Sequence, residues 1–136
     1  MPACIPRRVP LWVWWVPVVV IVSLPVSGVT SQPQWSRVHA MPFSDPEDKP
    51  SDTLLNIAMF VPFGYLFGRG RRMPAALAGA MVAAALVSAG AEATQLFSTV
   101  RNPSGTDVSM AVAGAAIGAI LRLRRNQRTW TGEVTR

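Results

Sequence analysis

The sequence contains one cysteine, one histidine and one lysine among 136 residues. Because Cys4 has no second cysteine to pair with, an intramolecular disulfide scaffold is excluded. His39 as the only histidine argues against a zinc site built on histidines and against a Ser-His-Asp triad within this chain. We therefore expect no metal and no cofactor.

Charged residues are also scarce. They make up 15% of the chain, whereas a soluble domain carries about 25%. Hydrophobic residues make up 50%, which excludes a disordered chain, and the length allows one domain with tails. Four stretches concentrate this apolar content: residues 9–36, 53–68 and 108–121 contain no charge, and residues 73–97 contain only Glu92.

These four stretches predict four membrane-spanning helices, since a span needs about 20 apolar residues. We place the helices at residues 9–29, 53–67, 74–97 and 107–121. The predicted fold class is therefore all-α, a polytopic (multi-pass) helix bundle in the plasma membrane. The first stretch follows Arg7 and Arg8, so it has two interpretations: a retained helix acting as a signal anchor, which we adopt, or a signal peptide cleaved after Gly28.

The distribution of basic residues predicts the topology of these helices. Ten of the 13 Lys and Arg residues fall in three segments on one side of a four-span protein: residues 1–8, 69–72 and 122–136. Lys and Arg accumulate in cytoplasmic loops, so we expect both termini in the cytoplasm and an exposed, flexible extracytoplasmic loop at residues 30–51. The basic tail has a second interpretation as an anionic-lipid or nucleic-acid patch. The chain carries no recognisable nucleic-acid module, and we expect no nucleic-acid partner.

Glu92 lies inside a predicted span, where a charge at the helix centre costs about 2.5–3.5 kcal/mol on insertion scales. It is therefore expected either to have a partner or to stay protonated. Helical spacing also predicts which residues share its face. They are Ser88, Gln95 and Thr99 towards the outer end and Ala76, Ala80 and Ala84 towards the inner end.

A matching face on the fourth helix follows the same spacing: Asp107, Ala111, Gly114 and Gly118. The two glycines form a GxxxG pair, which allows close helix contact and leaves oligomerisation through this face open. Because a short loop joins the third and fourth helices, we expect an antiparallel hairpin whose small faces pack together. Such a hairpin, with the second helix beside it and Arg101 between the carboxylates, would gather five polar residues: Asn56, Glu92, Gln95, Arg101 and Asp107.

Three segments carry ordered motifs. Residues 56–64 read NIAMFVPFG, residues 92–95 read EATQ and residues 101–107 read RNPSGTD. In that order they resemble the N-x-x-x-F-x-P-x-G, E-x-x-Q and R-x-x-[D/S]-x-x-D motifs of VanZ-like membrane proteins. The resemblance covers residues 51–121 and departs from the family at Ala111, where Asn is usual. The residues expected at helix contacts are Pro62, Gly64, Gly114 and Gly118.

The resemblance implies a small bacterial membrane protein of the cell envelope. The family's namesake is associated with low-level resistance to the lipoglycopeptide teicoplanin, which implies a link to glycopeptide tolerance without assigning resistance to this chain. Because buried charges in membranes mark functional sites, we expect the five polar residues to line a site at the outer leaflet. That site would bind an amphiphilic or lipid-linked envelope ligand, with membrane lipids as further partners. The chain would then be an accessory or binding protein.

Two alternatives stay open. The first is a membrane enzyme acting on a lipid-linked substrate, with Glu92 and Asp107 as an acid and base pair. No nucleophile motif or metal triad supports it, so we lean towards a non-enzymatic role. The second is a purely structural clasp, in which the polar cluster only holds the helices together.

Overall fold

The computed structural model describes residues 9–24, 27–46, 49–70 and 72–134, with side chains described as far as Gln127. Over this part the fold is all-helical, which confirms the all-α part of the predicted class. Two short 3₁₀ helices, η1 (Leu11–Trp14) and η2 (Trp35–Arg37), accompany four α-helices. The α-helices are α1 (Trp15–Ser23), α2 (Pro50–Phe67), α3 (Met73–Gln95) and α4 (Gly105–Val134). The predicted N-terminal tail, residues 1–8, lies outside the described residues.

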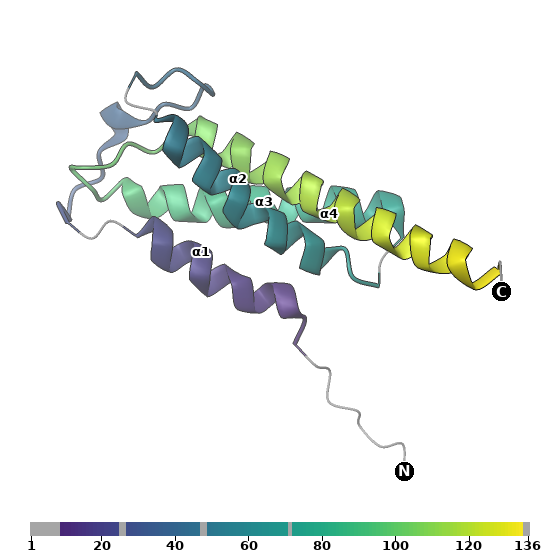
Figure 1. Ribbon diagram of the computed structural model, residues 1–136. Coiled ribbons are helices and arrows are strands. Elements are labelled where there is room, and N and C mark those ends of the chain that lie inside the picture. Colours follow the sequence, from purple (N-terminus) through teal and green to yellow (C-terminus); the bar gives the residue numbers. More distant parts are fainter. Residues whose placement is uncertain (1–8, 25–26, 47–48, 71, 135–136) are drawn as a thin grey trace, which may run out of the picture.

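The four helices run alternately up and down, with α2, α3 and α4 forming a bundle and α1 lying along one side of it (Figure 1). One end of the molecule gathers the α1–α2 segment and the α3–α4 loop; we call it the cavity end. The opposite end holds the α2–α3 turn and the exposed part of α4; we call it the arginine end. The connections from α2 to α3 and from α3 to α4 are short, which makes these helices antiparallel neighbours.

The first helix is shorter than the predicted span of residues 9–29. Helical structure runs from Leu11 to Ser23, and Leu24 is extended with ψ 135°. Leu24 precedes Pro25, and the proline ring disfavours the α conformation in the residue before it. The helix therefore ends well before the apolar run does.

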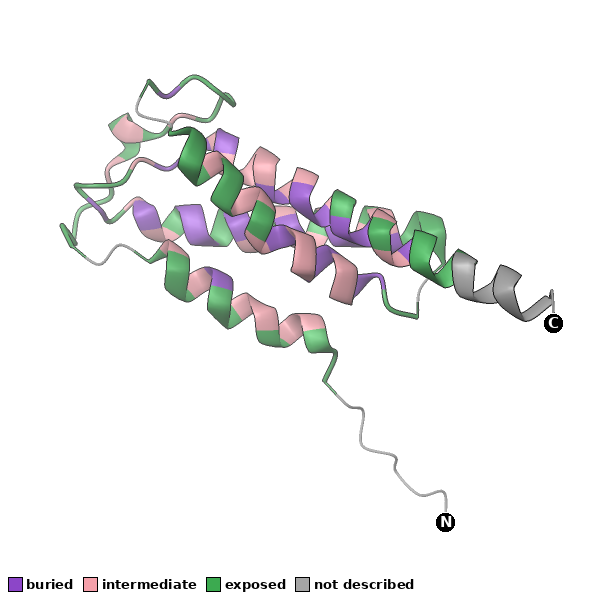
Figure 2. Ribbon diagram, in the orientation of Figure 1, coloured by how far each residue is buried: buried purple, intermediate pink, exposed green. Residues whose placement is uncertain are grey.

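The core is built from small side chains and a cluster of aromatic side chains, whereas large aliphatic side chains face outward. The fully buried alanines belong to α3 and α4: Ala76, Ala80, Ala84, Ala111, Ala115 and Ala119. Phe60 and Phe63 of α2 are also fully buried, and Trp12 contacts Phe67 with ring centroids 5.1 Å apart. Leu86 of α3 is 70% exposed, and Figure 2 shows such exposed residues along the outward sides of the helices. This pattern is typical of helices that face lipid, because close approach there depends on small residues.

The glycines of α4 contact α2, so the predicted partner of the GxxxG face is wrong. A Cβ added to Gly114 would lie 2.5 Å from the Ile57 carbonyl oxygen, and one added to Gly118 would collide with the Val61 carbonyl. In return, a Cβ on Gly64 of α2 would collide with the Ala115 backbone. Three glycines thus allow α2 and α4 to approach backbone to backbone. The oligomer predicted through this face is untested, and within one chain α2 covers it.

The segment between α1 and α2 is docked onto the α3–α4 loop, which corrects the expectation of a flexible loop. The Thr30 N–H donates to the Phe97 carbonyl at 2.9 Å, and the Gln34 N–H donates to the Leu96 carbonyl at 2.7 Å. Further along, His39 donates to Pro103 at 3.0 Å and accepts from Gly105 at 2.8 Å. These backbone bonds hold residues 27–46 over the ends of α3 and α4.

Candidate functional site

A cavity of about 610 Å³ lies at the cavity end, between α1, α2 and the ends of α3 and α4. Its apolar wall comes from α1 and α2 and includes Val19, Val22, Leu55, Met59 and Phe60. Its polar wall includes all five residues that the sequence gathered: Asn56, Glu92, Gln95, Arg101 and Asp107. The structure therefore brings the predicted residues together, while their role in binding a ligand stays a prediction.

Glu92 is the centre of the polar wall and is 8% exposed. The Gln95 amide, on the same face of α3, donates to Glu92 Oε1 at 3.2 Å. The Ser104 backbone N–H, just before α4 begins, donates to Glu92 Oε2 at 2.9 Å. The carboxyl group therefore links α3 to the start of α4, and it has the partner that the cost of its burial requires.

Asp107 joins this group from the first turn of α4. The Asn56 amide of α2 donates to Asp107 Oδ1 at 2.5 Å. Asp107 lines the same cavity as Glu92. The polar wall thus brings together side chains from α2, α3 and α4.

Arg101 takes a different place from the one predicted between the two carboxylates. It lines the cavity, but its side chain is exposed. Its backbone N–H donates to Ser98 Oγ at 3.1 Å, which fixes the loop that carries it. The Glu92 oxygens are instead satisfied by the Ser104 N–H and the Gln95 amide. Arg101 therefore contributes an exposed positive charge to the cavity wall.

Sequence reasoning missed a second polar chain in the same wall. The Asn102 amide donates to Asp45 Oδ2 at 3.2 Å, and Arg37 Nε donates to Asn102 Oδ1 at 2.8 Å. Asp45 is 8% exposed although it lies in the α1–α2 segment. The sequence shows Asp45 close to two other acidic residues, but no sequence pattern indicated that Asn102 would be its partner. The two residues meet because the α1–α2 segment is docked on the α3–α4 loop, and no sequence pattern predicted that contact.

The charges of the site are mixed. The four acidic residues whose side chains are described, Asp45, Asp52, Glu92 and Asp107, all line this cavity, together with Lys49 and Arg101. In the described ranges no group of three His, Cys, Asp or Glu side chains could hold a metal ion. The arrangement offers amide donors, carboxyl acceptors and two cations to a polar group, beside an apolar wall.

A family model described as VanZ/LLP1 matches residues 9–125, a range that contains α1, α2, α3 and the whole cavity wall. No curated protein and no solved structure shows significant similarity to the chain.

Proposed function

Because the chain belongs to the VanZ/LLP1 family, we propose that it is a multi-pass membrane protein that binds an amphiphilic envelope molecule. The cavity end would lie at the outer leaflet and the arginine end at the cytoplasmic surface, with α1 to α4 all spanning. The predicted divisions go with this proposal: cytoplasmic tails at residues 1–8 and 122–136, an extracytoplasmic loop at 30–51 and a VanZ-like domain at 51–121. The role would be accessory, without turnover of the ligand.

The membrane placement is supported by helix length and by surface composition. Met73–Gln95 and Gly105–Gln127 are long and apolar enough to cross a bilayer. The helical part of the first apolar run, Leu11–Ser23, is shorter, so it would need local thinning of the bilayer or help from flanking residues. The exposed leucines, isoleucines and valines of α1, α3 and α4 would then face lipid tails.

An amphiphilic ligand is proposed because the cavity has one polar wall and one apolar wall. One side holds amide and carboxyl groups that can bind hydroxyl and amide groups of a headgroup. The other side holds Val19 and Val22 of α1 and Leu55 and Met59 of α2, which can cover an acyl or polyprenyl tail. Since these apolar residues come from two different helices, a tail can lie between α1 and α2 while its headgroup reaches Glu92.

A binding experiment tests this proposal. Purified full chain is photocrosslinked to a diazirine-tailed glycolipid whose headgroup carries hydroxyl and acetamido groups, and to a phosphocholine lipid with the same tail. Removing one hydrogen bond to a charged acceptor costs about 1.5–3 kcal/mol, so Glu92→Gln should lower glycolipid capture at least about tenfold. Arg124→Gln, at an exposed position of α4 outside the cavity wall, should leave capture within about twofold.

Cells give a second test of the same proposal. In a bacterium that carries the protein, Glu92→Gln should abolish an envelope phenotype, such as altered lipoglycopeptide tolerance, while the protein still inserts in the membrane. A wild-type phenotype with Glu92→Ala and Asp107→Ala together would contradict a functional site here.

One observation favours the enzymatic alternative. Two carboxyl groups, those of Glu92 and Asp107, line the same cavity, where they would serve as proton donor and proton acceptor. This alternative predicts that purified protein turns over a lipid-linked substrate and that Glu92→Gln stops the turnover. Retained turnover in that variant would exclude the acid and base pair.

A further inference from the structure

A second polar cluster lies at the arginine end, away from the cavity. The hydroxyl of Tyr65, near the end of α2, accepts hydrogen bonds from Arg122 Nη1 at 3.2 Å and from Arg125 Nη1 at 3.0 Å. Both arginines belong to α4 and are three residues apart, so they share one face. The Arg122 guanidinium also lies over the Tyr65 ring, 5.2 Å from its centroid. We call Tyr65, Arg122 and Arg125 the arginine cluster.

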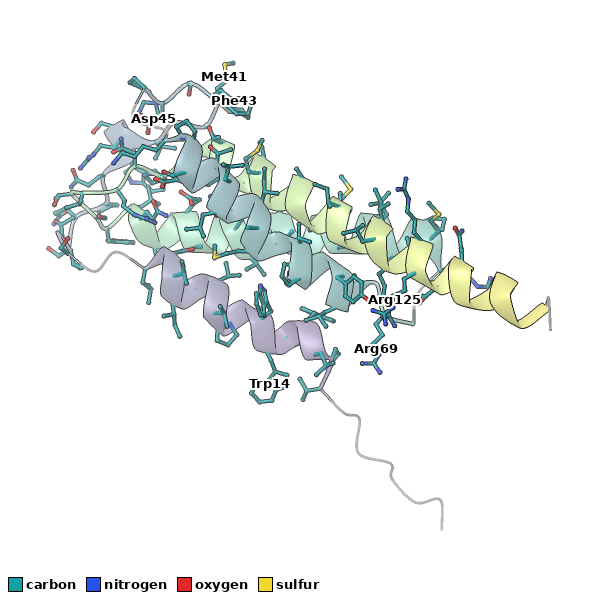
Figure 3. All side chains as sticks on the ribbon, viewed as in Figure 1. Trp14, Met41, Phe43, Asp45, Arg69 and Arg125 are labelled. Carbon is teal, nitrogen blue, oxygen red and sulfur yellow. The ribbon has the colours of Figure 1, made fainter. Side chains whose placement is uncertain are left out.

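The arginine cluster has no acidic partner among the side chains that the structure describes. The four described acidic side chains line the cavity at the opposite end. Arg69 and Arg72, on the α2–α3 turn, add further positive charge, and Figure 3 shows Arg69 and Arg125 at the same end of the molecule. Two guanidinium groups therefore converge on one neutral oxygen atom, although like charges repel. An anion between them would remove that repulsion.

The arginine cluster also has hydrogen-bond donors that are not used within the described chain. Arg122 Nε is buried and makes no hydrogen bond to the described residues. Both hydrogen bonds that the Tyr65 hydroxyl makes within the described chain are accepted ones, so its own proton is left for a further acceptor. Two donors of the cluster, Arg122 Nε and the Tyr65 hydroxyl, therefore lack an acceptor among the described residues. A buried donor without an acceptor is costly, and a ligand rich in oxygen acceptors would satisfy it.

We propose that the arginine cluster binds the phosphate group of an anionic lipid headgroup at the inner membrane surface. Planar guanidinium groups match phosphate oxygens and bind them through charge-assisted hydrogen bonds. The exposed Trp14 lies at the same end (Figure 3), and tryptophan is enriched at the level of lipid headgroups. The lipid source rests on the proposed membrane placement, whereas the phosphate chemistry rests on the cluster alone.

Topology alone does not account for the arginine cluster. The positive-inside rule needs arginines on one side of the membrane, and it sets no condition on where their side chains point. Arg124 meets that rule from an exposed position on α4. Arg122 and Arg125 instead converge on a hydroxyl of another helix. Arg124 therefore serves as the matched control, because it carries the same charge on the same helix.

The test is a titration of the purified full chain in a non-ionic detergent at fixed salt. The ligands are dihexanoylphosphatidylglycerol, dihexanoylphosphatidylcholine and inorganic phosphate, and microscale thermophoresis gives each Kd. Arg125→Gln, at an exposed position that tolerates substitution, should weaken phosphatidylglycerol binding about tenfold or more. Tyr65→Phe should weaken it about threefold, since one neutral hydrogen bond is lost. Arg124→Gln should change it less than about twofold.

The outcomes separate the sources of the phosphate. Tighter binding of phosphatidylglycerol than of phosphate, with phosphatidylcholine weakest, supports the lipid headgroup. Phosphate binding as tightly as phosphatidylglycerol, with the same dependence on Arg125, would overturn the lipid assignment and indicate a free anion. Equal losses in Arg124→Gln and Arg125→Gln would overturn the proposal, because binding would then depend on general positive charge. Binding at this end and glycolipid capture at the cavity can fail independently.

Discussion

The contact between α2 and α4 makes a quantitative prediction for Gly118→Ala. The added Cβ would collide with the Val61 carbonyl oxygen and approach the Tyr65 nitrogen to 2.7 Å, so α2 would have to move outward. Overpacking of this kind costs about 1–3 kcal/mol, and the upper end applies because the obstructing atoms are backbone. Alanine regains about 1 kcal/mol of helix propensity. The expected result is a loss of about 2 kcal/mol in unfolding free energy.

Gly90→Ala is the matched control, because it makes the same chemical change in α3 with nothing within 4 Å of the added Cβ. It should raise stability by up to about 1 kcal/mol through helix propensity alone. Unfolding is followed by circular dichroism during titration of the micelles with sodium dodecyl sulfate. Equal stability of the two variants would refute the close approach of α2 and α4. Loss of a dimer without loss of monomer stability would instead make the GxxxG face an oligomer interface.

Three further predictions follow from other contacts. Trp15→Phe removes the indole donor that binds the Met59 carbonyl at 2.8 Å, so it should lower unfolding free energy by about 1 kcal/mol, whereas Trp14→Phe, at an exposed position, should not. Asn56→Ala leaves Asp107 without its amide donor and should reduce glycolipid capture; if capture persists and only folded yield falls, the cluster is a structural clasp. In a background without the native cysteine, Ser44→Cys should react with an impermeant maleimide in intact cells and Arg71→Cys should not, and the reverse pattern would overturn the proposed topology.

The sequence was sufficient to predict an all-helical chain and the residues that meet at the polar wall. Charge-free stretches mark helices of the right type, and helical spacing puts Glu92 and Gln95 on one buried face. The motif order then brought in Asn56 and Asp107 from two other helices. These features are local in sequence or repeat with the period of a helix, which is why they could be read without a structure.

The features that were missed depend on pairing between distant segments. GxxxG spacing shows that α4 has a face without bulky side chains. It does not show that this face packs against α2, where Gly64 leaves room for the α4 backbone. The docking of residues 27–46 onto the α3–α4 loop uses backbone groups, and these are the same in every sequence. Arg101 was placed between two carboxylates because charges attract, whereas a backbone N–H and an amide already satisfy Glu92.

The central claim is that an amphiphile lies in the cavity with its headgroup at Glu92. The most direct measurement replaces Leu55, which lines the cavity, with the photocrosslinking residue benzoylphenylalanine in living cells. The same replacement at Leu86, exposed on α3 and outside the cavity wall, reports contact with bulk lipid. Mass spectrometry then identifies the molecules attached at each position.

We predict that the Leu55 position captures a defined amphiphile that the Leu86 position does not, and that Glu92→Gln removes this adduct while leaving bulk lipid adducts unchanged. The same lipid mixture at both positions, unaffected by Glu92→Gln, would contradict the proposed site.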